Sequence, residues 1–156
     1  MGRSDDLWNR ADRMAWEEEL LPPGDLLAAA AREFRRVAAP LQVIHGDLLG
    51  NVLFEPGSAP AIIDWAPYWR PAGLGLAIAA VDAACWHGWP SDRLNELGAG
   101  IAFWGQLLIR ALAFRVATQV NHDRWDADME ARHAPVLDAA IAAAQMDGAS
   151  GDPRRD

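Results

Sequence analysis

The chain of 156 residues is long enough for one domain with a hydrophobic core, and its 51% hydrophobic and 23% charged residues are typical of a globular protein. A formal net charge of −8 argues against nucleic acid or a membrane as the partner, because both attract clustered basic residues. All 14 basic residues are arginine, so a mechanism that needs an ammonium side chain must take it from another chain.

The sequence also limits the compartment. Its one cysteine, Cys85, excludes an internal disulfide and is expected to be a buried small apolar residue. The acidic residues before Leu20 contain no apolar core of a secretory signal, and the longest apolar stretch, 71–86, is interrupted by Asp82 and too short to span a membrane. We therefore expect a cytoplasmic protein.

Helical patterns occupy most of the chain. Apolar spacing and breaking residues predict helices over 5–20, 25–38, 76–86, 94–120 and 128–145. We expect a solvated face at Glu17–Glu19, a break near Gly98–Gly100 and a bend at Pro135. One domain over residues 1–146 and a disordered tail over 147–156 complete the expected organisation.

A short segment of different character interrupts these helices. It predicts strands at 41–44, 52–54 and 61–63, with a turn at 55–58 between the last two. The Pro- and Gly-containing residues after Asp64 predict a loop that extends to Gly75. The predicted fold class is therefore mainly α with a small β-hairpin insert.

Four polar residues in this insert can carry chemistry: His45, Asp47, Asn51 and Asp64. Phosphoryl transfer needs a carboxylate that orients and deprotonates an attacking hydroxyl, and oxygen ligands that hold Mg²⁺ against nucleotide phosphates. Asp47 follows a strand, where a carboxylate can face a substrate. A hairpin would bring Asn51 beside Asp64 as a pair of metal ligands, with Asp47 a short distance away.

Three stretches carry a family resemblance, and they read His45-Gly46-Asp47-Leu48, Asn51-Val52-Leu53-Phe54 and Ile62-Ile63-Asp64-Trp65. They resemble the aminoglycoside phosphotransferase and choline kinase family, which has the protein-kinase-like fold. The resemblance implies a catalytic Asp47 in a loop supported by His45, with Asn51 and Asp64 as Mg²⁺ ligands. It further implies ATP as the phosphoryl donor and a small-molecule hydroxyl as the acceptor. The alternative is a simple turn with a capping aspartate and a packed histidine.

The chain departs from that family in three ways. Three residues separate Asp47 from Asn51, where four are usual, which affects the metal geometry. The acidic residues that usually follow the metal ligand are absent from 70–77, although Asp82 comes soon after. The 44 residues before His45 read as helices without a glycine-rich loop, so we expect the helical C-terminal lobe without the nucleotide-binding lobe.

Three functional hypotheses follow. In the first, the chain is a phosphotransferase domain in which Arg70 is the nearest cation and Trp65, Tyr68 and Trp69 line the substrate cleft. In the second, it is a non-catalytic remnant or interaction module that exposes its cleft surface to a partner or to a second copy. In the third, a separate polypeptide supplies the missing nucleotide-binding lobe.

Overall fold

The computed structural model describes residues 3–150, and the side chains of residues 7–148. Its helices are α1 (Arg3–Ala15), α2 (Asp25–Arg32), α3 (Leu74–Trp86), α4 (Leu94–Leu97), α5 (Trp104–Asn121) and α6 (Ala127–Ser150). A single 3₁₀ turn, Ser91–Arg93, leads into α4. The prediction of a mainly helical chain is confirmed, as is the break between α4 and α5 near Gly98–Gly100.

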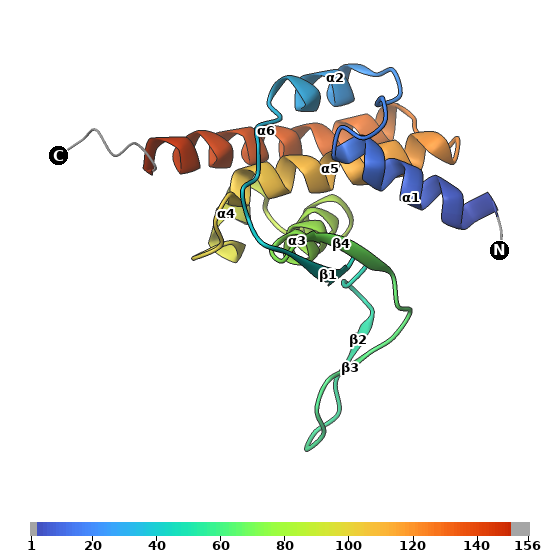
Figure 1. The fold of residues 1–156 in the computed structure, drawn as a ribbon, viewed down its shortest axis with the longest axis vertical. Helices are drawn as coiled ribbons and strands as arrows, with labels where there is room; N and C mark the ends of the chain where they lie inside the picture. Colours follow the sequence, from blue (N-terminus) through green and yellow to red (C-terminus); the bar gives the residue numbers. More distant parts are fainter. Residues whose placement is uncertain (1–2, 151–156) are drawn as a thin grey trace.

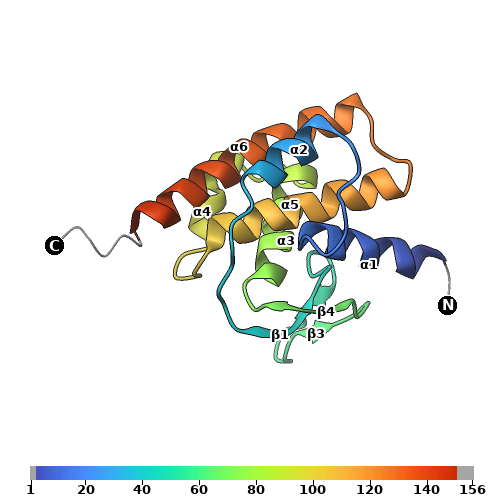
Figure 2. The same ribbon diagram turned by 45° about the horizontal axis from the view of Figure 1, so that its top comes forward.

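Helix α5 is the centre of the core. It packs against α1, α2, α3 and α6, and every residue from Trp104 to Thr118 is buried. Figures 1 and 2 show α2 lying over α5 and α6, with α3 on the opposite side of α5. A helix that is covered on all sides needs apolar residues all round, which explains its long apolar run. Among the described residues, no helix has the length and apolar character to cross a membrane.

Helices α5 and α6 approach closely where α5 begins. A Cβ atom on Gly105 would lie 2.0 Å from the backbone nitrogen of Ala144, so only glycine fits there. The backbone N–H of Gly105 donates a hydrogen bond of 2.9 Å to the Asp147 carboxylate, which satisfies one of the amides left free at a helix start. Of the residues 147–156 that were predicted to form a disordered tail, 147–150 continue α6, and 151–156 lie outside the described residues.

The strands form two separate antiparallel pairs. Strand β1 (Leu41–His45) pairs with β4 (Pro67–Pro71), and β2 (Val52–Leu53) pairs with β3 (Ala61–Ile62). The prediction of a loop after Asp64 missed β4, whose prolines lie at its two ends, where the missing N–H is tolerated. In Figure 1 the β2–β3 hairpin projects away from the helices.

Two helices end earlier than the sequence predicted. Helix α2 stops at Arg32 because the Gln106 side chain of α5 takes the next backbone groups: it donates to Glu33 O at 2.9 Å and accepts from Arg35 N at 2.7 Å. Helix α1 stops at Ala15, and Glu17 then takes a left-handed φ of 62°.

The three glutamates after α1 were expected on a solvated helix face; Glu17 and Glu18 are exposed, but all three lie beyond the end of the helix. Each binds arginine at 3.0 Å or less. Their partners are Arg110 of α5 for Glu17, Arg70 of β4 for Glu18, and Arg10 and Arg13 of α1 for Glu19. This turn therefore ties α1 to the sheet and to the central helix.

The site segment reaches the core through β1 and α3. Ile44 is buried, and a Cβ atom on Gly75 of α3 would lie 3.2 Å from His45 O, so strand and helix are in close contact there. Cys85 of α3 is buried, as predicted, and burial raises the pKa of its thiol to about 12.

Candidate functional site

His45 supports the loop that follows β1. Its Nδ1 atom accepts a hydrogen bond of 3.0 Å from the backbone N–H of Asp47, and its Nε2 atom lies 3.3 Å from Ile63 O. Because Nδ1 accepts, the ring proton belongs on Nε2, which donates to Ile63 O. The imidazole therefore joins the loop of Asp47 to the segment that leads into Asp64.

Asn51 also turns toward Asp47. Its Nδ2 atom donates to Asp47 O at 2.7 Å and to Asp47 Oδ2 at 3.3 Å. Its backbone oxygen accepts a hydrogen bond of 3.0 Å from Ile63 N. The short spacing between Asp47 and Asn51 thus forms a closed loop in which one side chain braces the other.

The β2–β3 hairpin returns the chain to this loop, as the sequence predicted. Val52 pairs with Ile62, and the backbone N–H of Gly46 donates to Ala66 O at 2.8 Å beyond the hairpin. Asp64 lies between these contacts with a left-handed φ of 51°, a conformation that aspartate tolerates better than most residues. The backbones of residues 45–51 and 62–66 are therefore held side by side.

Asp47 and Asp64 line one hollow of about 570 Å³, together with Trp8, Trp65 and Tyr68. The structure thus brings these two aspartates to the wall of one cavity, which we call the carboxylate hollow. Asn51 lies against Asp47, and no hydrogen bond joins its side chain to that of Asp64 within the described part of the chain.

A buried arginine from α5 completes the surroundings of Asp47. Arg115 Nη2 lies 2.8 Å from Asp47 Oδ1, and its Nε donates to Asp82 Oδ1 of α3 at 2.8 Å. A further bond joins Nη2 to Asp82 Oδ2. Burial opposes the charge of this guanidinium, but Asp82 and Asp47 outweigh that effect and raise the pKa of Arg115 above its ordinary value.

Arg115 is the site residue that sequence reasoning missed. It was treated only as an interruption of an apolar helix. An arginine in the middle of a run such as Leu107–Ala117 is buried with the rest of the helix, and a buried charge requires a partner. That signal leads to Asp82, a carboxylate within another apolar helix, and from there to Asp47.

A second hollow of about 250 Å³ lies beside the same aspartate. Its wall includes Asp47, Asp82 and Arg115, with Trp8 and Trp86 as large apolar surfaces. Asp47, whose side chain is 44% exposed, can therefore be reached from two cavities. One cavity also contains Asp64, and the other contains the arginine and its second carboxylate.

Two other residues proposed for the site have different surroundings. Arg70 binds Asp12 at 2.6 Å and Glu18 at 2.7 Å, so its guanidinium is already engaged by carboxylates. Trp69 lines a separate hollow with Arg70 and Asp12. Of the aromatic residues expected in a substrate cleft, Trp65 and Tyr68 face the carboxylate hollow.

The carboxylates of this site are too few to hold a metal ion without other ligands. Within the described residues, no group of three or more His, Cys, Asp or Glu side chains could hold a metal ion. Magnesium bound with a nucleotide commonly takes only one or two protein carboxylates, with phosphates and water as the remaining ligands. A site with one carboxylate for the metal, Asp64, is compatible with that requirement, whereas a metal held entirely by protein ligands would not fit.

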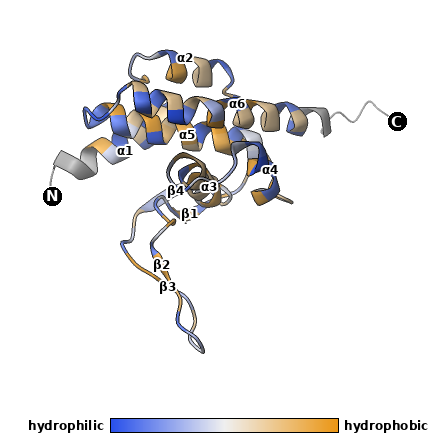
Figure 3. Ribbon diagram, turned by 180° about the vertical axis from the view of Figure 1, so that it is seen from behind, coloured by the Kyte–Doolittle hydropathy of each residue, from blue (hydrophilic) through white to orange (hydrophobic). Residues whose placement is uncertain are grey.

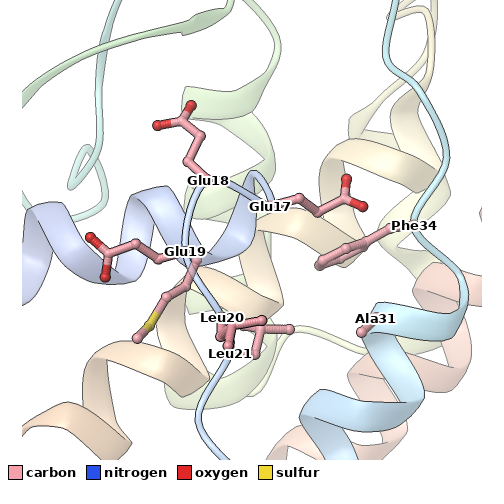
Figure 4. Close-up of a pocket in the computed structure, with 8 residues that line it drawn as sticks. Glu17, Glu18, Glu19, Leu20, Leu21, Ala31 and Phe34 are labelled. Carbon is pink, nitrogen blue, oxygen red and sulfur yellow. The ribbon is translucent and has the colours of Figure 1, made fainter.

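Another hollow, of about 500 Å³, lies between the turn after α1 and helix α2. Figure 4 shows Leu20, Leu21 and Phe34 in its wall, together with the three glutamates of the turn. It shares no lining residue with the carboxylate hollow, and its glutamates are engaged by arginines. We therefore assign the candidate site to Asp47 and its neighbours.

Fold and site together define a mainly helical protein with a braced carboxylate loop and a projecting hairpin. Comparison of the chain with protein-family models, with curated proteins and with solved structures found no match. Membership of the phosphotransferase family stays a prediction.

Proposed function

We propose that the chain carries the carboxylate part of a phosphoryl-transfer site of the aminoglycoside phosphotransferase and choline kinase type, with ATP as donor and a small-molecule hydroxyl as acceptor. The main support is the shared hollow of Asp47 and Asp64, whose backbone segments are joined through His45 and Asn51. Transfer from a magnesium nucleotide requires one carboxylate for the acceptor and another for the metal.

In this proposal Asp47 orients the acceptor hydroxyl and accepts its proton. Arg115 binds Asp47 Oδ1 and Asn51 binds Oδ2, so the carboxylate is fixed in one orientation. The transition state of phosphoryl transfer is loose, and positioning contributes more than basicity. A carboxylate that is paired with arginine therefore suits the task. We place the acceptor in the hollow between Trp8 and Trp86, where Asp47 is accessible.

Asp64 and Asn51 are the proposed ligands of Mg²⁺. Asn51 uses its Nδ2 atom to brace Asp47, which leaves its amide oxygen as the ligand atom. The bound ion would neutralise charge on the nucleotide phosphates. Asp64 lies just after β3 in the carboxylate hollow, from which its side chain could reach such an ion.

The nucleotide needs groups that this site does not provide. No arginine is among the described residues that line the carboxylate hollow, and the sequence contains no lysine. Phosphates and adenine would therefore be bound by another polypeptide segment that assembles with this chain. The proposal places the assembled protein in the cytoplasm.

Manganese in place of magnesium tests the metal ligands directly. With ATP present, Mn²⁺ should broaden the amide NMR signals of Asn51 and Asp64. Asp64→Asn should weaken this binding roughly tenfold, which corresponds to about 1.4 kcal/mol. Glu55→Gln removes the same charge from the hairpin turn and is the matched control. If the broadening spread over the whole acidic surface, or if Asp64→Asn left it unchanged, the assignment of Asn51 and Asp64 as metal ligands would be wrong.

A second candidate is a non-catalytic interaction module derived from the same family. The observation that favours it is the exposure of large apolar side chains along the strands. Two measurements separate the candidates. If Asp47→Asn abolishes phosphoryl transfer and leaves the circular dichroism spectrum unchanged, the first candidate is supported. If the wild-type chain binds a partner protein but no nucleotide, the second is supported.

A further inference from the structure

Exposed apolar side chains are concentrated on the strand segment. Of the thirteen large hydrophobic side chains that are exposed in the described part of the chain, nine lie between residues 41 and 69. We call these nine the strand surface: Leu41, Val43, Leu49, Leu53, Phe54, Ile62, Ile63, Trp65 and Trp69. Figure 3 shows apolar residues along the projecting hairpin, well away from the helical core. A concentration of exposed apolar side chains is typical of an interaction site.

The hairpin lacks the cover that such a structure usually needs. Strands β2 and β3 are two residues long and pair only with each other. An isolated two-stranded hairpin is marginally stable in water, and three or more strands or a packed helix are needed for independent stability. Phe54, just after β2, is 79% exposed, and Ile62 is 54% exposed. An added strand would cover these side chains and pair with a free hairpin edge.

The charge of the strand segment indicates what kind of polypeptide would bind to it. No basic residue occurs between Arg36 and Arg70, whereas the same stretch contains Asp47, Glu55 and Asp64. Asp47 is paired with Arg115, but within the described residues neither Glu55 nor Asp64 forms an ion pair. A strand surface that is apolar and acidic is complementary to a polypeptide that is apolar and basic.

We infer that the strand surface docks an extended segment of a different polypeptide, in which basic residues alternate with apolar ones, as an added strand beside the hairpin. Apolar side chains would cover Phe54 and Ile62, and basic ones would face Glu55, the hairpin carboxylate that the proposed metal site does not use. A second copy of this chain fits less well, because hairpin against hairpin would bring like charges together. Trp65 belongs both to this surface and to the carboxylate hollow, so the docked segment would border that hollow. Docking itself does not require phosphoryl transfer.

Two synthetic peptides test this inference without nucleotide or metal. Both would be eight residues long with valine at alternate positions, one with lysine between the valines and the other with glutamate. The lysine peptide should shift amide NMR signals within residues 41–69, and the glutamate peptide should bind at least about tenfold more weakly. Equal binding of the two peptides, or shifts that map outside 41–69, would overturn the inference.

Matched double variants show where the lysine peptide binds. Phe54→Ser with Ile62→Ser should weaken binding about tenfold, whereas Leu20→Ser with Met146→Ser, at two exposed apolar positions elsewhere, should not change it. Circular dichroism should be unchanged in both, since all four side chains are exposed. A dimer that light scattering detects and that the first variant abolishes would identify a second copy as the occupant and overturn the inference. Failure of the manganese test would leave this result unaffected.

Discussion

The helices of this protein bury charged side chains, whereas its strand segment exposes apolar ones. Helix α5 buries two arginines, Arg110 and Arg115, at 3% and 5% exposure, while the hairpin exposes Phe54 at 79%. Buried charge is costly unless it is paired, and exposed apolar surface has a cost unless it is covered. In the helical body the partners of the buried charges are present in the chain. The exposed side chains of the hairpin are without such cover in the described structure.

The paired arginines also explain how the body holds the site. Arg110 donates to the backbone of Ala15 at 2.8 Å and binds Glu17, and its guanidinium lies over the rings of Trp16 and Phe34. Arg115, five residues later on the same helix, binds the two carboxylates at the site. One helix therefore anchors both the turn after α1 and the loop of Asp47.

The largest expected effect is the loss of Arg115. Arg115→Met leaves Asp82 buried without its partner, and breaking a buried pair in this way typically costs about 3–5 kcal/mol. Urea unfolding should show a loss of that order. Arg93→Met removes an arginine from an exposed pair with Glu96 and should leave the midpoint almost unchanged.

The double variant Arg115→Met with Asp82→Leu sharpens this prediction. Replacing both charges by apolar residues of similar volume should recover much of the stability, because no buried charge remains unpaired. If the single variant unfolded at the wild-type urea concentration, the pair would not stabilise the body.

A somewhat smaller effect is expected where α5 meets α6. A Cβ atom at Gly105 would overlap the backbone of Ala143 and Ala144, so Gly105→Ala should force the helices apart and cost about 1–3 kcal/mol. Gly148→Ala, in α6 with no atom within 4 Å, should instead stabilise the protein by about 0.5–1 kcal/mol. Thermal unfolding should show a lower midpoint temperature for Gly105→Ala and a higher one for Gly148→Ala. If both midpoints shifted equally, the close contact between Gly105 and the α6 backbone would be absent.

The same contrast explains what the sequence could predict. Periodicity located the helices and the hairpin, because these depend on local patterns. The early ends of α1 and α2 depend on Glu17 and Gln106, which bind groups that are far away in the chain, and no local pattern contains that information. The continuation of α6 likewise depends on the bond from Gly105 to Asp147.

The candidate site divides in the same way. The loop of Asp47 and the return of Asp64 follow from residues close in sequence, and the hairpin between them was predicted. Arg115 lies 68 residues beyond Asp47 and became visible only when α5 was placed against the loop. The sequence contained a usable sign of it, a charge within a buried helix, but not the identity of its partner.

The next prediction concerns pH. Burial lowers the pKa of His133 below its ordinary value of 6.5, and the nearby Arg132 lowers it further, although the bond to Met129 O and the charge of Asp82 oppose the shift. The ring packs against Trp86 and Trp125, and its Nε2 atom has no hydrogen-bond partner in the described structure. The folded state therefore favours the neutral imidazole.

The sign of the pH effect follows from this preference. Well above pH 6.5 the His133 imidazole is neutral in both the folded and the unfolded chain, so its burial does not lower the unfolding free energy. Below pH 6.5 the unfolded chain binds a proton that the folded one resists, so stability falls, by at most about 1.4 kcal/mol per pH unit, until the pH reaches the folded pKa. The difference in unfolding free energy between wild type and His133→Gln should shrink from pH 7.5 to 5.5. His87→Gln, which removes an exposed imidazole, is the control, and a constant difference would contradict the prediction.

The smallest effect on stability, and the sharpest contrast with the body, is expected in the hairpin. Phe54→Ser should change the unfolding free energy by less than about 0.5 kcal/mol, because the side chain is exposed. Hydrogen exchange should then separate the regions. The amide of Ile63, bonded to Asn51 O, should exchange through local opening at almost no cost, whereas amides within α5 should exchange only on global unfolding. Binding of the lysine peptide should slow exchange in the hairpin and leave α5 unchanged. A hairpin already as protected as α5 would show that it is stable without cover, which would remove the main reason to expect a strand beside it.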